Sequence, residues 1–346
     1  MPKERVAVAM SGGVDSSVAA ARLKQAGYDV FGIHMQLWSD PDLAQTVSHL
    51  EHACHVLDIP FYKLDLEAEF HRLVIDYFCR EYSQGRTPNP CIVCNQRIKF
   101  GLLFDKALEM EAECLATGHY ARIERSPNGY RLLKAADKSK DQSYFLYTLG
   151  QKELKHLLLP VGNLRKAEVR KLAAELGLPT ASRRESQDVC FIPDNDYRSF
   201  IAGRISLKGG DIVDITGEVL GKHGGLARYT VGQRHGLELA SNQQLYVIEL
   251  DASNNRLVVG SKDQLLHSVL IASKLSWVSG EAPKEPISIA AKVRYKAPEV
   301  AAELHLNDIA EVRFAEPQLA IAPGQSVVFY QGDVVLGGGI IDAVLR

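Results

Sequence analysis

The chain has 346 residues, more than a single hydrophobic core usually serves, so two or three domains are expected. Its formal net charge of −2 excludes a general polycation, and any contact with nucleic acid must use local basic patches. The apolar run at residues 6–10 is too short for a signal peptide or a membrane span, and no longer apolar run follows it. We therefore expect a cytoplasmic protein that does not associate with a membrane.

Strand-like and helix-like segments alternate through the first half of the chain. Short apolar runs predict strands, and longer segments that end at glycine or proline predict helices. The predicted strands are residues 5–10, 28–37, 61–66 and 114–117, and the predicted helices are residues 16–26, 46–57, 70–82 and 96–110. Strict alternation of this kind predicts an α/β fold with a doubly wound parallel sheet.

The second half of the chain is different in character. One more helix is expected at residues 165–176, and short β-type segments follow at 245–250, 257–260, 287–295, 327–330 and 334–336. The Gln-Gly-Asp sequence at residues 331–333 is a hairpin signal, and short strands with glycine-rich turns predict a small barrel. We predict a catalytic domain at residues 1–200 (with a helical part around 160–180), a central β-rich domain at 201–272 and a C-terminal β-barrel at 273–346.

A candidate phosphate loop, SGGVDSS, occupies residues 11–17 between the first strand and the first helix. Its two glycines let the backbone approach an anion, and the amides at the helix N-terminus face that anion. The sequence is not a Walker-type loop, because the lysine of that motif is absent. A plain strand-to-helix turn capped by Ser16 is the less favoured alternative. His34 and Met35 lie at the end of the second predicted strand, where ligands of parallel sheets bind.

Six cysteines lie at positions 54, 79, 91, 94, 114 and 190. In a reducing compartment they are not expected to form a disulfide framework, so each is a core thiol, a metal ligand or a reactive group. Cys91 and Cys94 form a C-x-x-C pair that we place just before a helix, where a thiolate is stabilised. A second pair with zinc-ligand spacing is absent, which disfavours structural zinc. On its own, Cys190 between valine and phenylalanine is typical of a core residue, as are the other three cysteines.

Two family resemblances emerge from these motifs. The SGGVDSS segment resembles the PP-loop of ATP pyrophosphatases, in which the loop binds the pyrophosphate that leaves when AMP is transferred to a carbonyl oxygen. The chain as a whole resembles the MnmA/TrmU family of tRNA-uridine 2-sulfurtransferases nearly end to end. The motifs that carry this resemblance are residues 11–17, 87–95, 116–120, 140–146, 186–191, 229–236 and 323–326.

The resemblance implies an enzyme that uses ATP and Mg²⁺ to thiolate the wobble uridine of tRNA at C2. It makes Cys94 the nucleophile, Cys190 the carrier of a persulfide and Asp15 a candidate Mg²⁺ partner. The implied ATP site is Ala9, Met10, Ser11, Gly12, Gly13, Val14, Asp15, Ser16, Met35 and Gly118. The implied tRNA contacts are Asn89, Pro90, Cys91, His119, Lys140, Asp141, Gln142, Arg294, Tyr295 and Gln325, with residues 89–91 at the target base. The implied partners are the anticodon stem-loop and a sulfur donor, either a persulfide carrier protein or free sulfide.

One position departs from the family pattern, because Cys91 stands where many members have aspartate. Three cysteines, Cys91, Cys94 and Cys190, could then hold a [4Fe–4S] cluster with one open iron that binds sulfide. A persulfide route and a cluster route therefore compete, and the extra thiol at Cys91 slightly favours the cluster.

Two other readings of the function stay open. Another adenylating PP-loop enzyme would need neither Cys94 nor Cys190, and a non-catalytic tRNA-binding sulfur carrier would leave the phosphate loop unexplained. Two basic segments are candidate tRNA patches or simply solvated surfaces. They are Arg294, Tyr295 and Lys296 in the C-terminal region, and Arg165, Lys166, Arg170 and Lys171 on the predicted helix.

Overall fold

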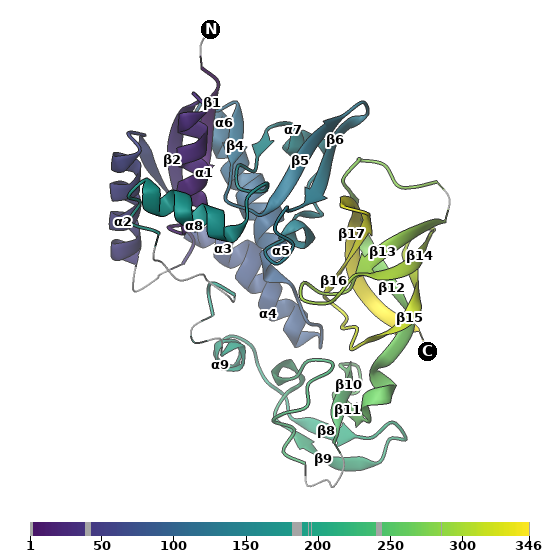
Figure 1. The fold of residues 1–346 in the computed structure, drawn as a ribbon. Helices are drawn as coiled ribbons and strands as arrows, with labels where there is room; N and C mark the ends of the chain where they lie inside the picture. Colours follow the sequence, from purple (N-terminus) through teal and green to yellow (C-terminus); the bar gives the residue numbers. More distant parts are fainter. Residues whose placement is uncertain are drawn as a thin grey trace.

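The computed structural model describes residues 3–38, 43–181, 189–192, 194, 196–239, 244–284 and 286–345. The chain forms an N-terminal α/β region, a small central β region and a C-terminal barrel, which Figure 1 shows in purple to teal, green and yellow. The predicted fold class is confirmed by this arrangement. Part of the predicted motif at 186–191, namely residues 186–188, lies outside the described residues. Within the described ranges, no helix is both long and apolar enough to cross a bilayer.

The N-terminal region is built on a parallel sheet with the strand order β3-β2-β1-β4-β7. The strands are β1 (Arg5–Ala9), β2 (Asp29–Gln36), β3 (Phe61–Asp65), β4 (Cys114–Ala116) and β7 (Leu157–Leu158). In β1 and just beyond it, Val6, Val8 and Met10 join one buried cluster and Ala7 and Ala9 join another. Both faces of β1 are therefore covered, which explains why this strand is a continuous apolar run instead of an alternating one.

Helices cover both faces of the sheet (Figure 1). Leu23 of α1 and Leu50 of α2 pack on the face of Val6 and Val8, while Leu103 and Phe104 of α6 pack on the other face. The helices of the N-terminal region are α1 (Val14–Gln25), α2 (Leu43–Val56), α3 (Glu67–Phe70), η1 (His71–Ile75), α4 (Asp76–Ser83), α5 (Pro90–Val93), η2 (Cys94–Leu102), α6 (Leu103–Glu109), η3 (Ser143–Leu146), α7 (Gln151–Lys155), α8 (Lys166–Glu175) and α9 (Tyr197–Ala202).

The helix predicted at residues 96–110 begins earlier than expected. Asn89 caps it by accepting a hydrogen bond from the amide of Ile92 (3.4 Å), and Pro90 occupies its first turn. The helix then continues through η2, a π-helical stretch from Cys94 to Leu102, into α6. The C-x-x-C pair therefore lies inside a helix and not before one. The Asn-Pro cap was a signal in the sequence that could have located this start.

A hairpin that the sequence did not predict connects the N-terminal region with the C-terminal barrel. It consists of β5 (Ala121–Ser126) and β6 (Gly129–Lys134), and β6 pairs with β17 of the barrel through Leu133 and Val334. Figure 1 shows this hairpin reaching from the N-terminal region toward the barrel. The hairpin of the N-terminal region and the barrel strands therefore share one continuous sheet.

The central region is a four-stranded sheet with the order β10-β11-β8-β9. Its strands are β8 (Gly210–Val213), β9 (Val219–His223), β10 (Tyr246–Asp251) and β11 (Arg256–Gly260), with short 3₁₀ turns η5 (Leu226–Arg228) and η6 (Lys262–Leu265). Its small core gathers residues such as Ile212, Val247 and Leu257, all fully buried.

The barrel closes because β12 pairs with both β15 and β17. Its strands are β12 (Leu266–Trp277), β13 (Ile287–Lys292), β14 (Val300–Leu306), β15 (Ala310–Leu319), β16 (Ser326–Gln331) and β17 (Val334–Leu345). The hairpin predicted at residues 331–333 is confirmed, with Gly332 at a φ of +59°. The strand predicted at 287–295 ends at Lys292, and β12 crosses the boundary predicted between residues 272 and 273.

Candidate functional site

The predicted phosphate loop follows β1 and leads into α1. Gly12 has a φ of +79°, a conformation that side-chain-bearing residues rarely adopt, and Gly13 is the extended residue that precedes the helix. The hydroxyls of Ser16 and Ser17 donate to the carbonyl of Gly13 at 3.1 and 3.2 Å. The loop therefore presents amides at the start of α1, which is the geometry that suits an anion.

Gly118 lies beside this loop, at a position where the structure requires a glycine. A Cβ atom on it would lie 2.7 Å from the carbonyl carbon of Asp15 and 2.7 Å from the amide nitrogen of Ser16. Contacts this short do not occur, so any larger residue would push the loop after β4 away from α1. The segment that begins at Gly118 therefore forms one wall of the phosphate loop.

The carboxylate of Asp15 is held by two neighbours. The Lys166 ammonium lies 2.8 and 2.7 Å from its two oxygens, and the Tyr120 hydroxyl donates to it at 2.7 Å. Lys166 is buried and comes from α8, so it is not part of a solvated basic face. The helix pattern alone did not distinguish Lys166 from the other basic residues of α8. Asp15 as a Mg²⁺ partner stays a prediction.

His34 and Met35 lie at the end of β2, beside the loop. His34 is buried, and its Nδ1 donates to the carbonyl of Met10 at 2.9 Å. This bond ties β2 to the residue just before the phosphate loop. Met35 packs against both the core under β1 and the cluster that contains Cys94. The nucleotide end of the sheet is thus continuous with the region of the cysteines.

The cysteines of the two distant motifs come together. Cys94 is buried, Cys91 is half-buried and Cys190 remains accessible at the surface. The chain around Cys190 is anchored by Phe191, whose ring lies 5.6 Å from Phe70. Phe191 and Cys94 belong to the same buried cluster. Cys54, Cys79 and Cys114 are buried in the core, as predicted.

Desolvation by the surrounding protein raises the pKa of each of these three thiols, including Cys190, whose side chain also reaches the surface. The pKa of Cys190 rises from 9.0 to about 12, mainly by desolvation and further through Cys94 and Cys91. Burial also raises the pKa of Cys91 and of Cys94, and the nearby Lys99 opposes the rise in all three. A thiolate at Cys91 or Cys94 is therefore disfavoured in this state, because desolvation raises the pKa of both thiols although the helix that starts at Pro90 would favour the thiolate of Cys91.

Cys91, Cys94 and Cys190 do not form a ready site for a single metal ion. Across the part of the chain that the structure describes, no three His, Cys, Asp or Glu side chains are arranged to hold a metal ion. In a [4Fe–4S] cluster each thiolate binds a different iron, so the cluster that the sequence favoured stays a prediction.

His119 connects the phosphate loop with the thiols. Its ring packs on Phe100 of η2 at 5.8 Å, and its Nδ1 lies 2.8 Å from the Thr117 hydroxyl. Burial and then Lys99 hold the pKa of His119 well below 6.5, so the ring is neutral near pH 7. Gly118 touches the phosphate loop and His119 contacts η2, so two consecutive residues bridge the two halves of the site.

The barrel contacts the segment that leads to the C-x-x-C pair. The Gln325 amide donates to the carbonyls of Thr87 (3.0 Å) and Pro88 (3.2 Å), and the Thr87 amide donates to Pro323 (2.8 Å). Gly324 has a φ of +92°, and a Cβ there would meet the Thr87 backbone at 2.8 Å. The barrel therefore holds the loop in front of Cys91, a role that the sequence did not reveal.

The other predicted tRNA residues divide into buried and accessible ones. Asp141 is buried and accepts hydrogen bonds from Ala135 and Ser143, and the Gln142 side chain accepts one from the Tyr120 amide. Lys140 is half-buried at the same turn. Asp141 and Gln142 therefore also shape the turn between β6 and η3.

The basic–aromatic segment of the barrel is only partly exposed. Arg294 and Lys296 are exposed, whereas the Tyr295 ring packs against Phe145 at 4.4 Å. The carbonyl of Phe145 accepts a hydrogen bond from Asn95 at 3.0 Å. Tyr295 thus joins the barrel to the helix of the cysteines.

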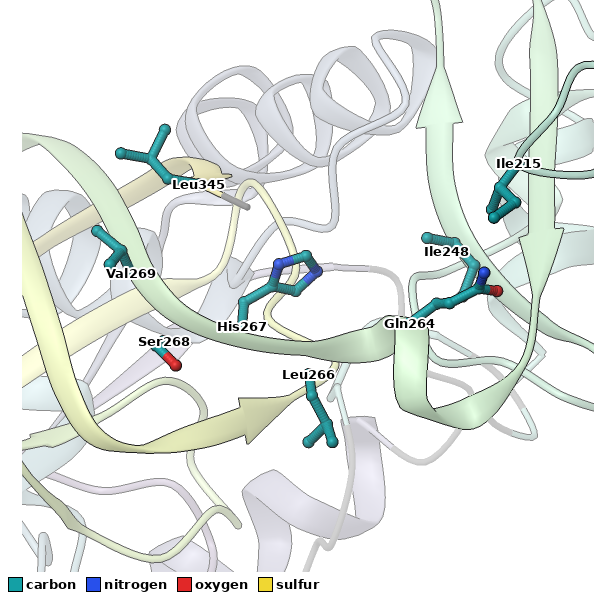
Figure 2. Close-up of a pocket in the computed structure, with 8 residues that line it drawn as sticks. All are labelled: Ile215, Ile248, Gln264, Leu266, His267, Ser268, Val269 and Leu345. Carbon is teal, nitrogen blue, oxygen red and sulfur yellow. The ribbon is translucent and has the colours of Figure 1, made fainter.

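A separate surface hollow lies between the central region and the barrel (Figure 2). Its lining residues are Ile215, Ile248, Gln264, Leu266, His267, Ser268, Val269 and Leu345. None of these is a predicted ATP, thiol or tRNA residue.

Family comparisons cover almost the whole chain. Residues 4–194 match a family described as the tRNA methyl transferase HUP domain, residues 198–261 the tRNA methyl transferase PRC-barrel domain, and residues 267–341 the aminomethyltransferase beta-barrel domain.

Similar proteins extend over the same length. The tRNA-specific 2-thiouridylase MnmA of Geobacter metallireducens is 48% identical, with 99% of this chain and 98% of that protein covered. MnmA 1 of Caldanaerobacter subterraneus subsp. tengcongensis is 47% identical, with 99% of each covered. A solved structure, the U34-tRNA thiolase NcsA from Methanococcus maripaludis with its [4Fe-4S] cluster, matches 59% of this chain and 65% of its own at 18% identity and a TM-score of 0.38. A similarity that low carries no inference about this site.

Proposed function

Because this chain belongs to the MnmA family of tRNA-specific 2-thiouridylases, which are sulfurtransferases, we propose that it replaces the C2 oxygen of the wobble uridine of tRNA with sulfur in an ATP-dependent reaction. The observation that carries the proposal is the bridge at residues 118 and 119. Gly118 closes on the phosphate loop, and His119 packs on the helix that bears Cys94. Activation of the base and delivery of sulfur can therefore take place in one site.

The first step activates the base. The uridine O2 attacks the α-phosphorus of ATP, the bond from the α-phosphorus to the bridging oxygen breaks, and pyrophosphate leaves. The amides at the start of α1 stabilise the charge that develops on the leaving group. Mg²⁺ carried by the triphosphate would neutralise part of that charge, and the carboxylate of Asp15 is the residue that would hold it. The C2 oxygen thereby becomes part of an adenylate, which can leave as AMP.

The second step delivers sulfur, and the thiols fit a persulfide route. A persulfide donor transfers its outer sulfur to Cys190 and keeps a thiol. Cys94 attacks the inner sulfur of the Cys190 persulfide, which forms a Cys94–Cys190 disulfide and releases hydrosulfide. Hydrosulfide attacks C2, AMP leaves, and a thiol reductant then supplies the two electrons that reopen the disulfide. The interaction of Cys190 with Cys94, seen in the pKa of Cys190, supports this pairing.

The cluster route is the alternative, in which Cys91, Cys94 and Cys190 would hold a [4Fe–4S] cluster whose open iron supplies the sulfide. We derive no step through a cluster. Cys91, in the first turn of α5 and beside the segment held by Gln325, would contact the target base together with Asn89 and Pro90.

The remaining tRNA contacts would be His119, Lys140, Asp141, Gln142, Arg294, Tyr295 and Gln325. The wobble base lies in a single-stranded loop, so its extrusion into the site costs little. Exposed Arg294 would meet the phosphate backbone, and neutral His119 can exchange hydrogen bonds with a base without adding charge.

Mass spectrometry of tRNA nucleosides tests the proposal. After incubation with enzyme, Mg-ATP, tRNA and a persulfide donor we expect 2-thiouridine, and none with Cys94→Ser or Cys190→Ser. Cys79→Ala, in the core of α4, is the matched control that keeps activity. Pyrophosphate release without tRNA, or thiolation by both serine variants, would contradict the proposal. An anaerobic preparation whose activity requires bound iron would replace the persulfide route by the cluster.

A further inference from the structure

A short segment before the C-x-x-C pair contacts all three regions of the chain. It comprises Gly85, Arg86 and Thr87, and it follows α4 of the N-terminal region. A Cβ atom on Gly85 would lie 3.2 Å from the Cβ atom of Leu250 in β10, so the segment packs on the central sheet. The Thr87 amide donates to the carbonyl of Pro323 in the turn before β16, at 2.8 Å. The three regions therefore meet at three consecutive residues.

The side chain of Arg86 lies at the centre of this junction. Its Nε donates to a carboxylate oxygen of Glu81 in α4 at 2.9 Å. Its Nη2 donates to the carbonyl of Ile341 at 3.3 Å and to a carboxylate oxygen of Asp342 at 3.4 Å, both in β17. A guanidinium carries its donor hydrogens in a rigid plane, so this bridge fixes the orientation of α4 relative to β17 as well as their separation.

The ion pair between Arg86 and Glu81 is largely shielded from water. The Glu81 side chain is 9% exposed and the Arg86 side chain is 23% exposed. The Arg86 amide also donates to the carbonyl of Glu81 at 3.0 Å, so backbone and side chain both tie this residue to α4. A buried carboxylate requires a cation, and a lysine would also meet that requirement. The simultaneous bonds to β17 are the part that calls for a guanidinium.

The junction is connected to the reactive helix by a short, stiff link. Arg86 lies three residues before Asn89, which caps the helix of the cysteines. Three residues span at most about 10 Å, and Pro88 within the link has a fixed φ. Cys91 lies in the first turn of the capped helix and Cys94 in the second. A shift of Arg86 relative to the barrel is therefore passed on to both thiols.

We propose that Arg86 is a positioning residue for sulfur transfer, which holds the helix of Cys94 in register with the barrel. The inference rests on the proposed function, since the barrel bears Arg294 and Gln325 among the proposed tRNA contacts and the target base has to meet the sulfur. Arg86 acts through the segment that follows it and touches neither the base nor the reacting sulfur. A misplacement of about 1 Å in a reacting group can lower a rate by about 100-fold.

The substitution Arg86→Lys separates positioning from charge neutralisation. It keeps a cation for Glu81, but a flexible ammonium does not reproduce the rigid fork that also binds β17. With full-length enzyme, a persulfide donor, Mg-ATP and tRNA, we expect kcat for 2-thiouridine formation to fall by about 10- to 100-fold. The KM for Mg-ATP and the KM for tRNA should change little, because neither ligand binds Arg86. Hydrogen–deuterium exchange of residues 86–95 without tRNA should accelerate.

The matched control is Arg122→Lys. Arg122 in β5 also joins the N-terminal region to the barrel, through Asp333 at 2.9 Å in the turn between β16 and β17, and its substitution should leave kcat unchanged. An unchanged kcat in Arg86→Lys overturns the inference, because charge neutralisation alone would then suffice. A raised KM for tRNA at unchanged kcat also overturns it, because Arg86 would then contact the tRNA.

A second variant covers the case in which Arg86→Lys does not fold. Combining Glu81→Gln with Arg86→Met leaves no buried charge unpaired and still removes the bridge to β17. The same fall in kcat supports the inference, and an unchanged kcat overturns it. If the unsubstituted enzyme forms no 2-thiouridine, the proposed function fails. Exchange of residues 86–95 then still distinguishes the two failures, because equal exchange in Arg86→Lys and the unsubstituted protein would show that Arg86 does not hold this segment.

Discussion

Gln325 links the barrel to the loop that precedes the C-x-x-C pair, and this link can be broken with one substitution. Gln325→Leu keeps a similar side-chain volume but removes both amide hydrogens. The carbonyls of Thr87 and Pro88 then lose donors that now lie 3.0 and 3.2 Å away. The hydrogen bond from the Thr87 amide to Pro323 stays, so the loop is loosened but not released.

The size of the effect follows from the two lost hydrogen bonds. Each contributes about 0.5–1.5 kcal/mol net, so together they stabilise the closed loop by about 1–3 kcal/mol. At 1.4 kcal/mol for each factor of ten, local opening of the loop should become roughly 5- to 150-fold more frequent. Amide exchange reports such local opening directly.

Hydrogen–deuterium exchange with mass spectrometry, followed on a peptide that covers residues 86–95 in the absence of tRNA, is the appropriate assay. We expect exchange in that peptide to accelerate by the same factor in Gln325→Leu. The matched control is Gln318→Leu in β15, whose amide donates to the carbonyl of Glu316 at 2.7 Å, away from the loop. Equal exchange of residues 86–95 in the unsubstituted and Gln325→Leu proteins would refute the reasoning. Gln325 would then not restrain this loop.

Two further perturbations test the nucleotide wall and the thiols. Gly118→Ala brings a Cβ to 2.7 Å from the backbone of α1. We therefore expect ATP affinity to fall by at least about tenfold in a binding titration. Unchanged affinity would show that the segment at residue 118 can move away from α1 without affecting the loop. The pKa of Cys190, raised from 9.0 to about 12, lowers the thiolate fraction at pH 8 by roughly 1,000-fold. Alkylation of Cys190 by iodoacetamide should therefore be slow, and its rate should increase about tenfold per pH unit between pH 7 and 9. Lys99→Met should slow it further, because Lys99 lowers that pKa. Alkylation as fast as that of free cysteine would show that the surface exposure of Cys190 determines its reactivity, not its packing.

Local patterns in the sequence were sufficient for the parallel sheet and for the phosphate loop. The strand predicted at residues 5–10 is β1, because a strand buried on both faces must be a continuous apolar run, and the strand predicted at residues 61–66 is β3, a partly exposed edge strand. The glycine at position 12 meets a local requirement, a left-handed turn, whereas the glycine at position 118 is required by the close approach of a distant segment, α1. The hairpin β5–β6 was missed, because its Arg- and Glu-containing strands show little alternation and are completed by pairing with β17.

The sequence by itself determined which residue types carry the chemistry: a glycine–serine loop for phosphate and cysteines for sulfur. Only the tertiary structure decided which charges and thiols meet. Four basic residues on one helix are alike in the sequence, but the packing of α8 on α1 directs Lys166 alone among them to Asp15. The reactivity of the thiols also depends on the fold, because desolvation by neighbours distant in the sequence outweighs the local helix. Contacts across more than a hundred residues leave no periodic signal in the chain, so the sequence can supply the functional groups but not their pairing.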